Sequence, residues 1–175
     1  MLPAELVDHL YYAYKDTGFK KISRVLQSIP ASVLWCGGIE SKTINRHRAV
    51  CVFQIAGSNS YFDILVEGIR AELHRSLKAS FWRGLGVGLV VFSPELIEED
   101  AVEKSVYSRS QVATTLIQWI INVSLESAHA TIAHTFAQVS TTPMVKAILD
   151  TLGIPDKNRN LLVISPVSLF KVKLW

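Results

Sequence analysis

Cysteine is scarce in this chain, and its scarcity excludes two classes of protein. Cys36 and Cys51 are the only cysteines among 175 residues. Two cysteines cannot supply the disulfide framework that holds small secreted domains together. No histidine lies at zinc-finger spacing from either one, so no structural zinc motif is present. Each cysteine stands in an apolar run, SVLWC or AVCVF, and we predict two buried, reduced thiols.

Long apolar runs are also lacking. The most apolar window, VATTLIQWIINVSL, is interrupted by Gln118 and Asn122 and falls short of the roughly 20 apolar residues that cross a bilayer. The N-terminal stretch MLPAELVDHLYYAYKD has no basic start followed by an apolar core, so it does not have the pattern of a signal peptide. Repeats and low-complexity tracts are absent as well. We therefore expect a protein of the cytosol, or of the cytosolic face of a membrane.

Charge is sparse and unevenly distributed. Hydrophobic residues make up 49% of the chain and charged residues 19%, which is typical of a globular protein, and we predict one domain over residues 1–175. Five acids and no base lie within nine residues: Glu95, Glu98, Glu99, Asp100 and Glu103. The remainder carries 18 bases against 10 acids, a net charge of +8. This distribution favours phosphate-bearing partners, or contact between the basic face of one copy and the acidic segment of another. The alternative is a solvated acidic helix start.

Hydrophobic periodicity predicts an α+β fold, with a mainly antiparallel sheet packed against several helices. Helices are expected at 3–17, 19–29, 61–81, 110–138 and 143–152, the long one near 110–138 being central. Strands are expected at 32–36, 48–55, 87–92, 161–166 and 167–175, with a polar loop from residue 37 through Arg48. Pro3 and Pro143 suit first helical positions, Thr142 suits an N-cap, and Gly18 and Gly153 suit helix ends.

Two glycine-containing stretches resemble phosphate loops but lack the required context. GLGVG, Gly84–Gly88, comes after a predicted helix and before a strand, whereas a dinucleotide fingerprint follows a strand and opens a helix. We interpret Gly84 as a helix stop, and Gly86 and Gly88 as positions of close packing. CGGIESKT, Cys36–Thr43, lacks two of the P-loop glycines and is followed by a strand, so we interpret it as a hairpin-like loop.

Side chains that could carry catalysis or bind a metal do not form a known motif. Glu126 and His129 can share a helix face, but His134 lies five residues further on, about 140° around a helix. We therefore expect no metal site, no cofactor and no catalytic residue. Asn122 begins a glycosylation sequon, which we discount because it falls inside a predicted helix. An enzyme using Cys36 with His47 as its base is a remaining alternative.

The predicted helix at 61–81 has a basic face. Four of its basic residues lie at spacings of three and four, opposite the apolar stripe of the helix: Arg70, His74, Arg75 and Lys78. Trp82 and Arg83 follow directly. Such a face can bind the phosphates of lipid or nucleic acid, with tryptophan as an interfacial anchor. The alternative is a solvated helix face, since nearby glutamates dilute the charge and Trp82 can be core.

Two blocks of the sequence, in this order, resemble the matrix proteins of rhabdoviruses. The first, residues 48–92, contains RAVCVFQIAG, the turn SNS, Tyr61-Phe62, a helix with Trp82, and VGLVVFS. The second, residues 143–173, begins PMVKAILDTLGIPDKNRN, continues into the strand LLVISP and ends with Ser-x-x-Ser-x-Phe-Lys spacing. Members with a long basic N-terminal arm and a proline-rich budding motif differ from this chain, which contains neither. The resemblance therefore implies a shorter branch, of the kind found in plant-infecting viruses.

The resemblance implies a non-enzymatic viral structural protein that self-associates and links the nucleocapsid to the inner face of the membrane during virion assembly. Its expected partners are itself, an anionic membrane surface and a nucleoprotein–RNA complex, with no small-molecule substrate. Its expected location is the virion and the host cytoplasm. The residues predicted to contact membrane or nucleocapsid are Lys42, Arg46, Arg48, Arg70, Arg75, Lys78, Trp82 and Arg83. The acidic segment that includes Glu95 and Glu103 is predicted to mediate self-association. The alternative function is a small cytosolic α+β regulatory or ligand-binding protein, with a pocket lined by Trp35, Phe53 and Trp119.

Overall fold

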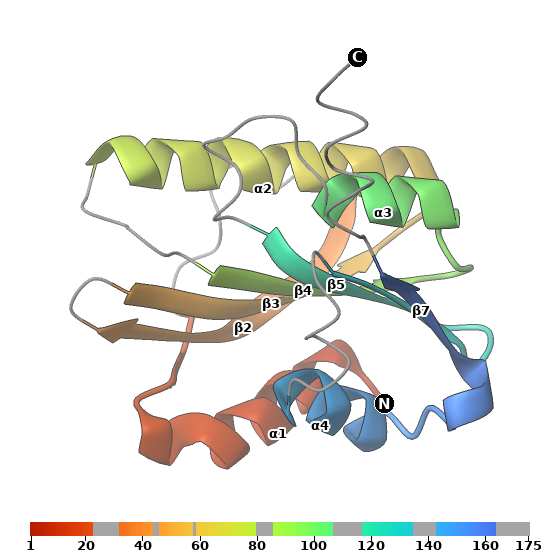
Figure 1. The fold of residues 1–175 in the computed structure, drawn as a ribbon, viewed down its shortest axis with the longest axis horizontal. Helices are drawn as coiled ribbons and strands as arrows, with labels where there is room; N and C mark the ends of the chain where they lie inside the picture. The colour runs from red at the N-terminus through yellow and green to blue at the C-terminus, as the bar shows by residue number, and fades with distance from the viewer. Residues whose placement is uncertain are drawn as a thin grey trace.

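In the part of the chain that the structure describes, a seven-stranded sheet forms the middle layer, with helices on both faces (Figure 1). The computed structural model describes residues 1–22, 32–43, 46–57, 59–79, 86–106, 117–134 and 143–163. The helices are α1 (Pro3–Tyr14), α2 (Asn59–Ala79), α3 (Glu99–Val106) and α4 (Pro143–Thr151), and the 3-10 turns are η1 (Lys15–Thr17) and η4 (Asp156–Asn158). The strands are β1 (Lys20–Lys21), β2 (Val33–Thr43), β3 (Arg46–Ile55), β4 (Gly86–Ser93), β5 (Ile117–Ser124), β6 (Ala130–His134) and β7 (Arg159–Val163).

The strands lie side by side in chain order, from β1 to β7. The pairs β1–β2, β2–β3 and β5–β6 are antiparallel, whereas β3–β4, β4–β5 and β6–β7 are parallel. The prediction of a mainly antiparallel sheet is therefore not confirmed for the described strands. The parallel pairs arise because a helix lies on each connection: α2 between β3 and β4, α3 between β4 and β5, and α4 between β6 and β7. Each such crossover returns the next strand to the same end of the sheet.

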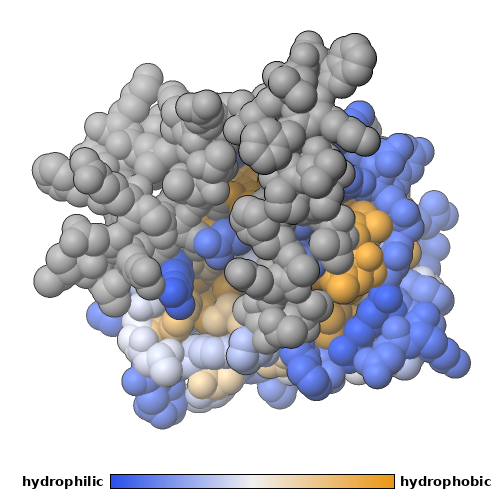
Figure 2. Space-filling model, in the orientation of Figure 1, coloured by the Kyte–Doolittle hydropathy of each residue, from blue (hydrophilic) through white to orange (hydrophobic). Residues whose placement is uncertain are grey.

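Each face of the sheet has its own apolar core. Along β3, Cys51 and Phe53 pack with α2 and α3, whereas Val50 and Val52 pack with α1 and α4. This alternation follows from the period of two in a strand. Because both faces are covered, the inner strands are apolar on both sides. At the surface, Figure 2 shows hydrophilic residues around the margin and an apolar patch near β7, where Leu161 is exposed.

The helix ends predicted from proline and glycine are confirmed. Helix α1 begins at Pro3, and the Glu5 carboxylate accepts a hydrogen bond from the Leu2 N–H at 3.0 Å. Gly18, with φ +92°, ends the turn after this helix. At the end of α4, Gly153 has φ +69° and the Ile154 N–H donates to the Leu149 carbonyl, the hydrogen bond of a Schellman cap.

The predicted long helix near 110–138 is wrong where the structure describes it. Residues 117–124 and 130–134 are strands β5 and β6, joined by a turn. In β5 only Gln118 is exposed, so the strand is apolar on both faces and shows no alternation that would distinguish it from a buried helix. Its isoleucines and valine favour a strand. Residues 110–116 and 135–138 of the predicted helix lie outside the described residues.

Two smaller predictions are also corrected. The helix expected at 19–29 begins instead with strand β1, Lys20–Lys21, and the rest of that segment from residue 23 lies outside the described residues. The polar loop expected after residue 36 is instead the continuation of β2 to Thr43, followed by β3 from Arg46. Thr142 and the strand expected at 167–175 lie outside the described residues.

The described part of the run GLGVG, residues 86–88, begins strand β4, and Gly88 provides close packing as predicted. Gly84, predicted to end a helix, lies outside the described residues. Gly88 pairs with Trp119 of β5. A Cβ atom at Gly88 would lie 2.1 Å from a ring carbon of that indole, which is itself buried. Glycine is therefore required here because the Trp119 ring occupies the space that a side chain would need.

Candidate functional site

The acidic segment lies at one end of the sheet. Strand β4 ends at Ser93, and the chain then crosses the end of the sheet to reach α3. The side chains of Glu95, Glu98, Glu99 and Asp100 are exposed, and that of Glu103 is half-buried. Glu99 and Asp100 lie in the first turn of α3, where negative charge is stabilised by the helix dipole. This agrees with the alternative of an acidic helix start and leaves the carboxylates accessible to a partner.

A buried amide holds this segment in place. The Asn122 side chain of β5 is fully buried, and its Oδ1 accepts a hydrogen bond from the Ile97 N–H at 2.7 Å. Its Nδ2 donates to the Val91 carbonyl at 3.1 Å and to Ser93 Oγ at 2.9 Å. The Glu98 N–H donates to an amide oxygen at the start of α2, Asn59 Oδ1, at 3.0 Å. The glutamates therefore project from a fixed backbone. The same burial makes Asn122 inaccessible to glycosylation in the folded protein.

The turn between β5 and β6 adds a further acid. Ser124 Oγ donates to the Pro94 carbonyl at 3.0 Å, and the Glu126 N–H donates to the same carbonyl at 3.3 Å. Glu126 is exposed, so its carboxylate extends the acidic surface. Sequence reasoning considered Glu126 only as a possible metal ligand, because it lay inside a predicted helix and away from the acidic segment in sequence. We call Glu95, Glu98, Glu99, Asp100, Glu103 and Glu126 the acidic end.

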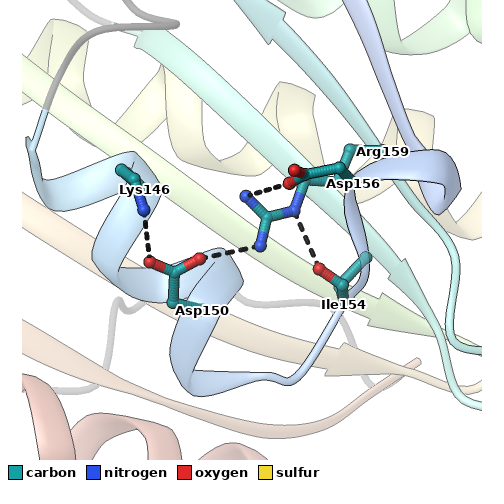
Figure 3. A network of polar contacts seen from close by, with 5 residues as sticks. All are labelled: Lys146, Asp150, Ile154, Asp156 and Arg159. Atoms are coloured by element: carbon teal, nitrogen blue, oxygen red, sulfur yellow. Dashed lines mark hydrogen bonds and ion pairs between the residues drawn. The ribbon is translucent and has the colours of Figure 1, made fainter.

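The nearby base Arg159, at the start of β7, is already engaged by other groups (Figure 3). Its guanidinium donates to Asp150 at 2.8 Å and to the Ile154 carbonyl at 2.8 Å, and it lies 3.4 Å from Asp156. Lys146 binds the same Asp150 at 2.7 Å. Hydrogen bonds from Lys146 and Arg159 lower the pKa of Asp150. Arg159 thus joins α4 to β7, and its charge is offset by Asp150 and Asp156.

The basic residues predicted on the hairpin lie at the other end of the sheet. Thr43 pairs with Arg46 and Ser41 with Arg48, which places these bases at the tip of the β2–β3 hairpin. Lys42 and Arg48 are exposed. Only the backbone of Arg46 is described. The structure therefore places the backbones of Lys42, Arg46 and Arg48 at the hairpin tip, with Lys42 opposite His47 rather than opposite either arginine.

The basic residues of α2 do not all lie near the hairpin tip. The backbones of Arg75 and Lys78 lie in the C-terminal half of α2, which Figure 1 shows above the hairpin tip. Arg70 is instead half-buried, and its guanidinium donates to the Ser105 carbonyl near the end of α3. Burial lowers the pKa of Arg70. Arg70 therefore ties α2 to α3, and Trp82 and Arg83 lie outside the described residues. We call Lys42, Arg46, Arg48, Arg75 and Lys78 the basic end.

The two ends are separated by the length of the parallel strands. Arg48 pairs with Gly86 at the start of β4, and the acidic segment begins directly after Ser93 at its finish. Eight residues of strand span about 25 Å. Figure 1 shows the hairpin tip and the start of α3 at opposite ends of the sheet.

The alternative catalytic pair is not assembled. Cys36 pairs with Phe53, whereas His47 pairs with Lys42, six residues further along the hairpin, or about 20 Å. Burial raises the pKa of the Cys36 thiol and raises that of Cys51 to about 12, so both environments disfavour the thiolate. Within the described ranges, no three His, Cys, Asp or Glu side chains are grouped so that they could hold a metal ion.

The pocket expected between Trp35, Phe53 and Trp119 is not formed by these three residues. Phe53 belongs to the core beneath α2 and α3, whereas Trp119 belongs to the core beneath α1 and α4, and Trp35 packs against the latter. The sheet itself separates Phe53 from the two tryptophans. The three aromatic side chains are therefore core residues of two different layers.

Comparison of the chain with protein-family models, curated proteins and solved structures found no significant match. None of the helices in the described ranges combines the length and the apolar character needed to cross a membrane.

Proposed function

We propose that this chain is a self-associating structural protein, in which the acidic end of one copy docks on the basic end of the next. The observation that carries this proposal is the placement of opposite charges at opposite ends of one rigid sheet. Such a contact is heterologous, because each copy uses a different surface for each neighbour. Heterologous contacts generate rings or open filaments rather than closed dimers.

The acidic end has the features expected of a docking surface. Its carboxylates are exposed, and the hydrogen bonds of Asn122 and Asn59 fix the backbone that carries them. A fixed backbone reduces the entropy lost when a partner binds. Opposite potentials also steer two copies together and set their relative orientation.

The resemblance of residues 48–92 and 143–173 to rhabdovirus matrix proteins suggests the setting in which such assembly is used. In that setting the protein links a nucleoprotein–RNA complex to the inner face of a membrane during virion assembly. The basic end that includes Arg48 is the surface suited to anionic lipid or to the nucleocapsid, since both present phosphates. Arg70 is no longer part of the proposed contact surface, because it binds the end of α3.

A charge-swap experiment tests the head-to-tail contact. One variant, Glu95→Lys with Glu98→Lys, reduces the charge of the acidic end from −6 to −2, and a second, Arg46→Glu with Arg48→Glu, reduces that of the basic end from +5 to +1. Each variant alone should stay small at low ionic strength, because one of the two ends that must attract each other has lost most of its charge. In an equimolar mixture the contact should recover in the form of pairs, since the intact basic end of the first variant can dock on the intact acidic end of the second. Light scattering at low salt measures the outcome.

A matched control for the first variant carries the same change in net charge elsewhere. Asp16→Lys with Glu67→Lys reverses two acids that are exposed on η1 and α2. We expect this protein to assemble as the unmodified chain does. Assembly by either end variant alone, or no recovery in the mixture, would contradict the proposed contact.

A further inference from the structure

His134 is a buried polar side chain whose hydrogen-bonding groups are unsatisfied. It is the last residue of β6, where it pairs with Trp119 of β5 and with Val163 of β7. Its side chain is fully buried, and within the described part of the chain neither Nδ1 nor Nε2 has a hydrogen-bond partner. A neutral imidazole carries one donor and one acceptor, and both are normally satisfied in a protein interior. Holding the ring here therefore costs free energy.

The surroundings of His134 are apolar. Directly paired residues of antiparallel strands point to the same face, so His134 lies on the face of Trp119, beneath α1 and α4. These helices turn apolar side chains toward the sheet: Leu6, Val7, Leu10, Val145, Ile148 and Leu149. Their charged or titratable residues Glu5, Asp8, His9, Lys146 and Asp150 are exposed. The titratable groups packed on this core are the phenols of Tyr11 and Tyr14, and burial raises the pKa of Tyr14.

We propose that His134 is an acid-sensitive switch, in which protonation of the imidazole opens the end of the β6–β7 pair. An imidazolium has two N–H donors and a full charge, and among the described residues neither ring nitrogen has a hydrogen-bond partner. A buried, unpaired charge must reach water. Among the described strands β7 lies at the edge of the sheet, so the route to water that breaks the fewest strand pairings separates His134 from Val163.

The direction of the pH dependence follows from burial. Desolvation lowers the pKa of His134 in the folded protein below its ordinary value of 6.5. Between the two pKa values the unfolded chain binds more protons than the folded one, so stability falls as pH falls. The loss begins near pH 6.5 and is complete below the folded pKa. For one proton, the folded-to-unfolded ratio falls by up to about tenfold per pH unit in this window.

The test compares urea denaturation of the unmodified chain and of His134→Leu between about pH 8 and pH 5. Leucine removes the titrating group and its unsatisfied nitrogens, so the variant should be at least as stable at neutral pH. It should also lack the loss below about pH 6.5, whereas carboxylates titrate alike in both proteins. Amide protection at Ala133, His134 and Val163 should fall on acidification only in the unmodified chain.

His129→Gln is the matched control. His129 is exposed in the turn between β5 and β6, so its replacement should leave the acid-dependent loss unchanged. An equal loss in His134→Leu and the unmodified chain would overturn the proposal. If His134→Leu does not fold, NMR titration of the imidazoles in the unmodified chain decides. An imidazole of His134 that stays neutral until the amides of β6 lose protection supports the switch, and one that titrates near 6.5 in an intact sheet contradicts it. The proposal does not depend on self-association.

Discussion

At the scale of single residues, the contact between Gly88 and Trp119 determines how closely two central strands can pack. The indole occupies the position that a Cβ atom of Gly88 would take, and both residues are in β strands buried on both faces. Gly88→Ala places a methyl group at 2.1 Å from a ring carbon that cannot move freely, because Trp119 is itself buried. We expect a loss of about 2–3 kcal/mol in the free energy of unfolding, measured by urea denaturation.

Removing the indole should reduce that loss. In the background Trp119→Leu, the Gly88→Ala change should cost at least 1 kcal/mol less than in the unmodified chain, on the order of measured couplings between contacting residues. Gly153→Ala is the control, since a Cβ there meets nothing within 4 Å and the strain comes from φ +69°. Its cost should be the same in both backgrounds. Equal costs for Gly88→Ala in both backgrounds would show that the ring is not the obstacle.

At the scale of elements, Asn122 joins β5 to the segment between β4 and α3. Asn122→Leu leaves the Ile97 N–H without its acceptor and the Ser93 hydroxyl without its donor, both in a buried site. An unsatisfied buried group costs about 1–3 kcal/mol, so we expect the free energy of unfolding to fall by about 3 kcal/mol. Gln118→Leu, at the one exposed position of the same strand, should change stability by less than about 0.5 kcal/mol. An Asn122→Leu protein as stable as the unmodified chain would contradict the anchoring role.

The helices and strands also show which features can be predicted from the sequence. Pro3, Gly18 and Gly153 located the helix ends correctly, because backbone sterics act within a few residues. Strand β5 was missed, since burial on both faces removes the alternation on which strand prediction depends. The isoleucines at 117, 120 and 121 were the available signal, as β-branched residues favour strands.

The candidate site was predictable in its residues but not in its arrangement. The acids at 95–103 and the bases Lys42, Arg46 and Arg48 are evident from charge alone. Their placement at opposite ends depends on the parallel pairing of β3 and β4, which is a long-range feature. Glu126 joins the acidic end only through the turn between β5 and β6. The engagement of Arg70 by α3 likewise depends on how two helices pack.

At the scale of the whole molecule, opposite charges lie at the two ends of the sheet. Its net charge of +3 is the sum of an acidic segment and a body of charge +8, and the sheet separates the acidic end from the basic end by about 25 Å. This separation exceeds the Debye length of about 8 Å at physiological salt. Each end therefore acts on a neighbour largely independently of the other.

The measurement that tests the central proposal most directly is sedimentation velocity across a series of protein and salt concentrations, with and without anionic liposomes. We predict growth into large species at low salt, reversal at high salt, and co-sedimentation with liposomes that weakens as salt rises. A sharp monomer or dimer that ignores both salt and liposomes would contradict the account.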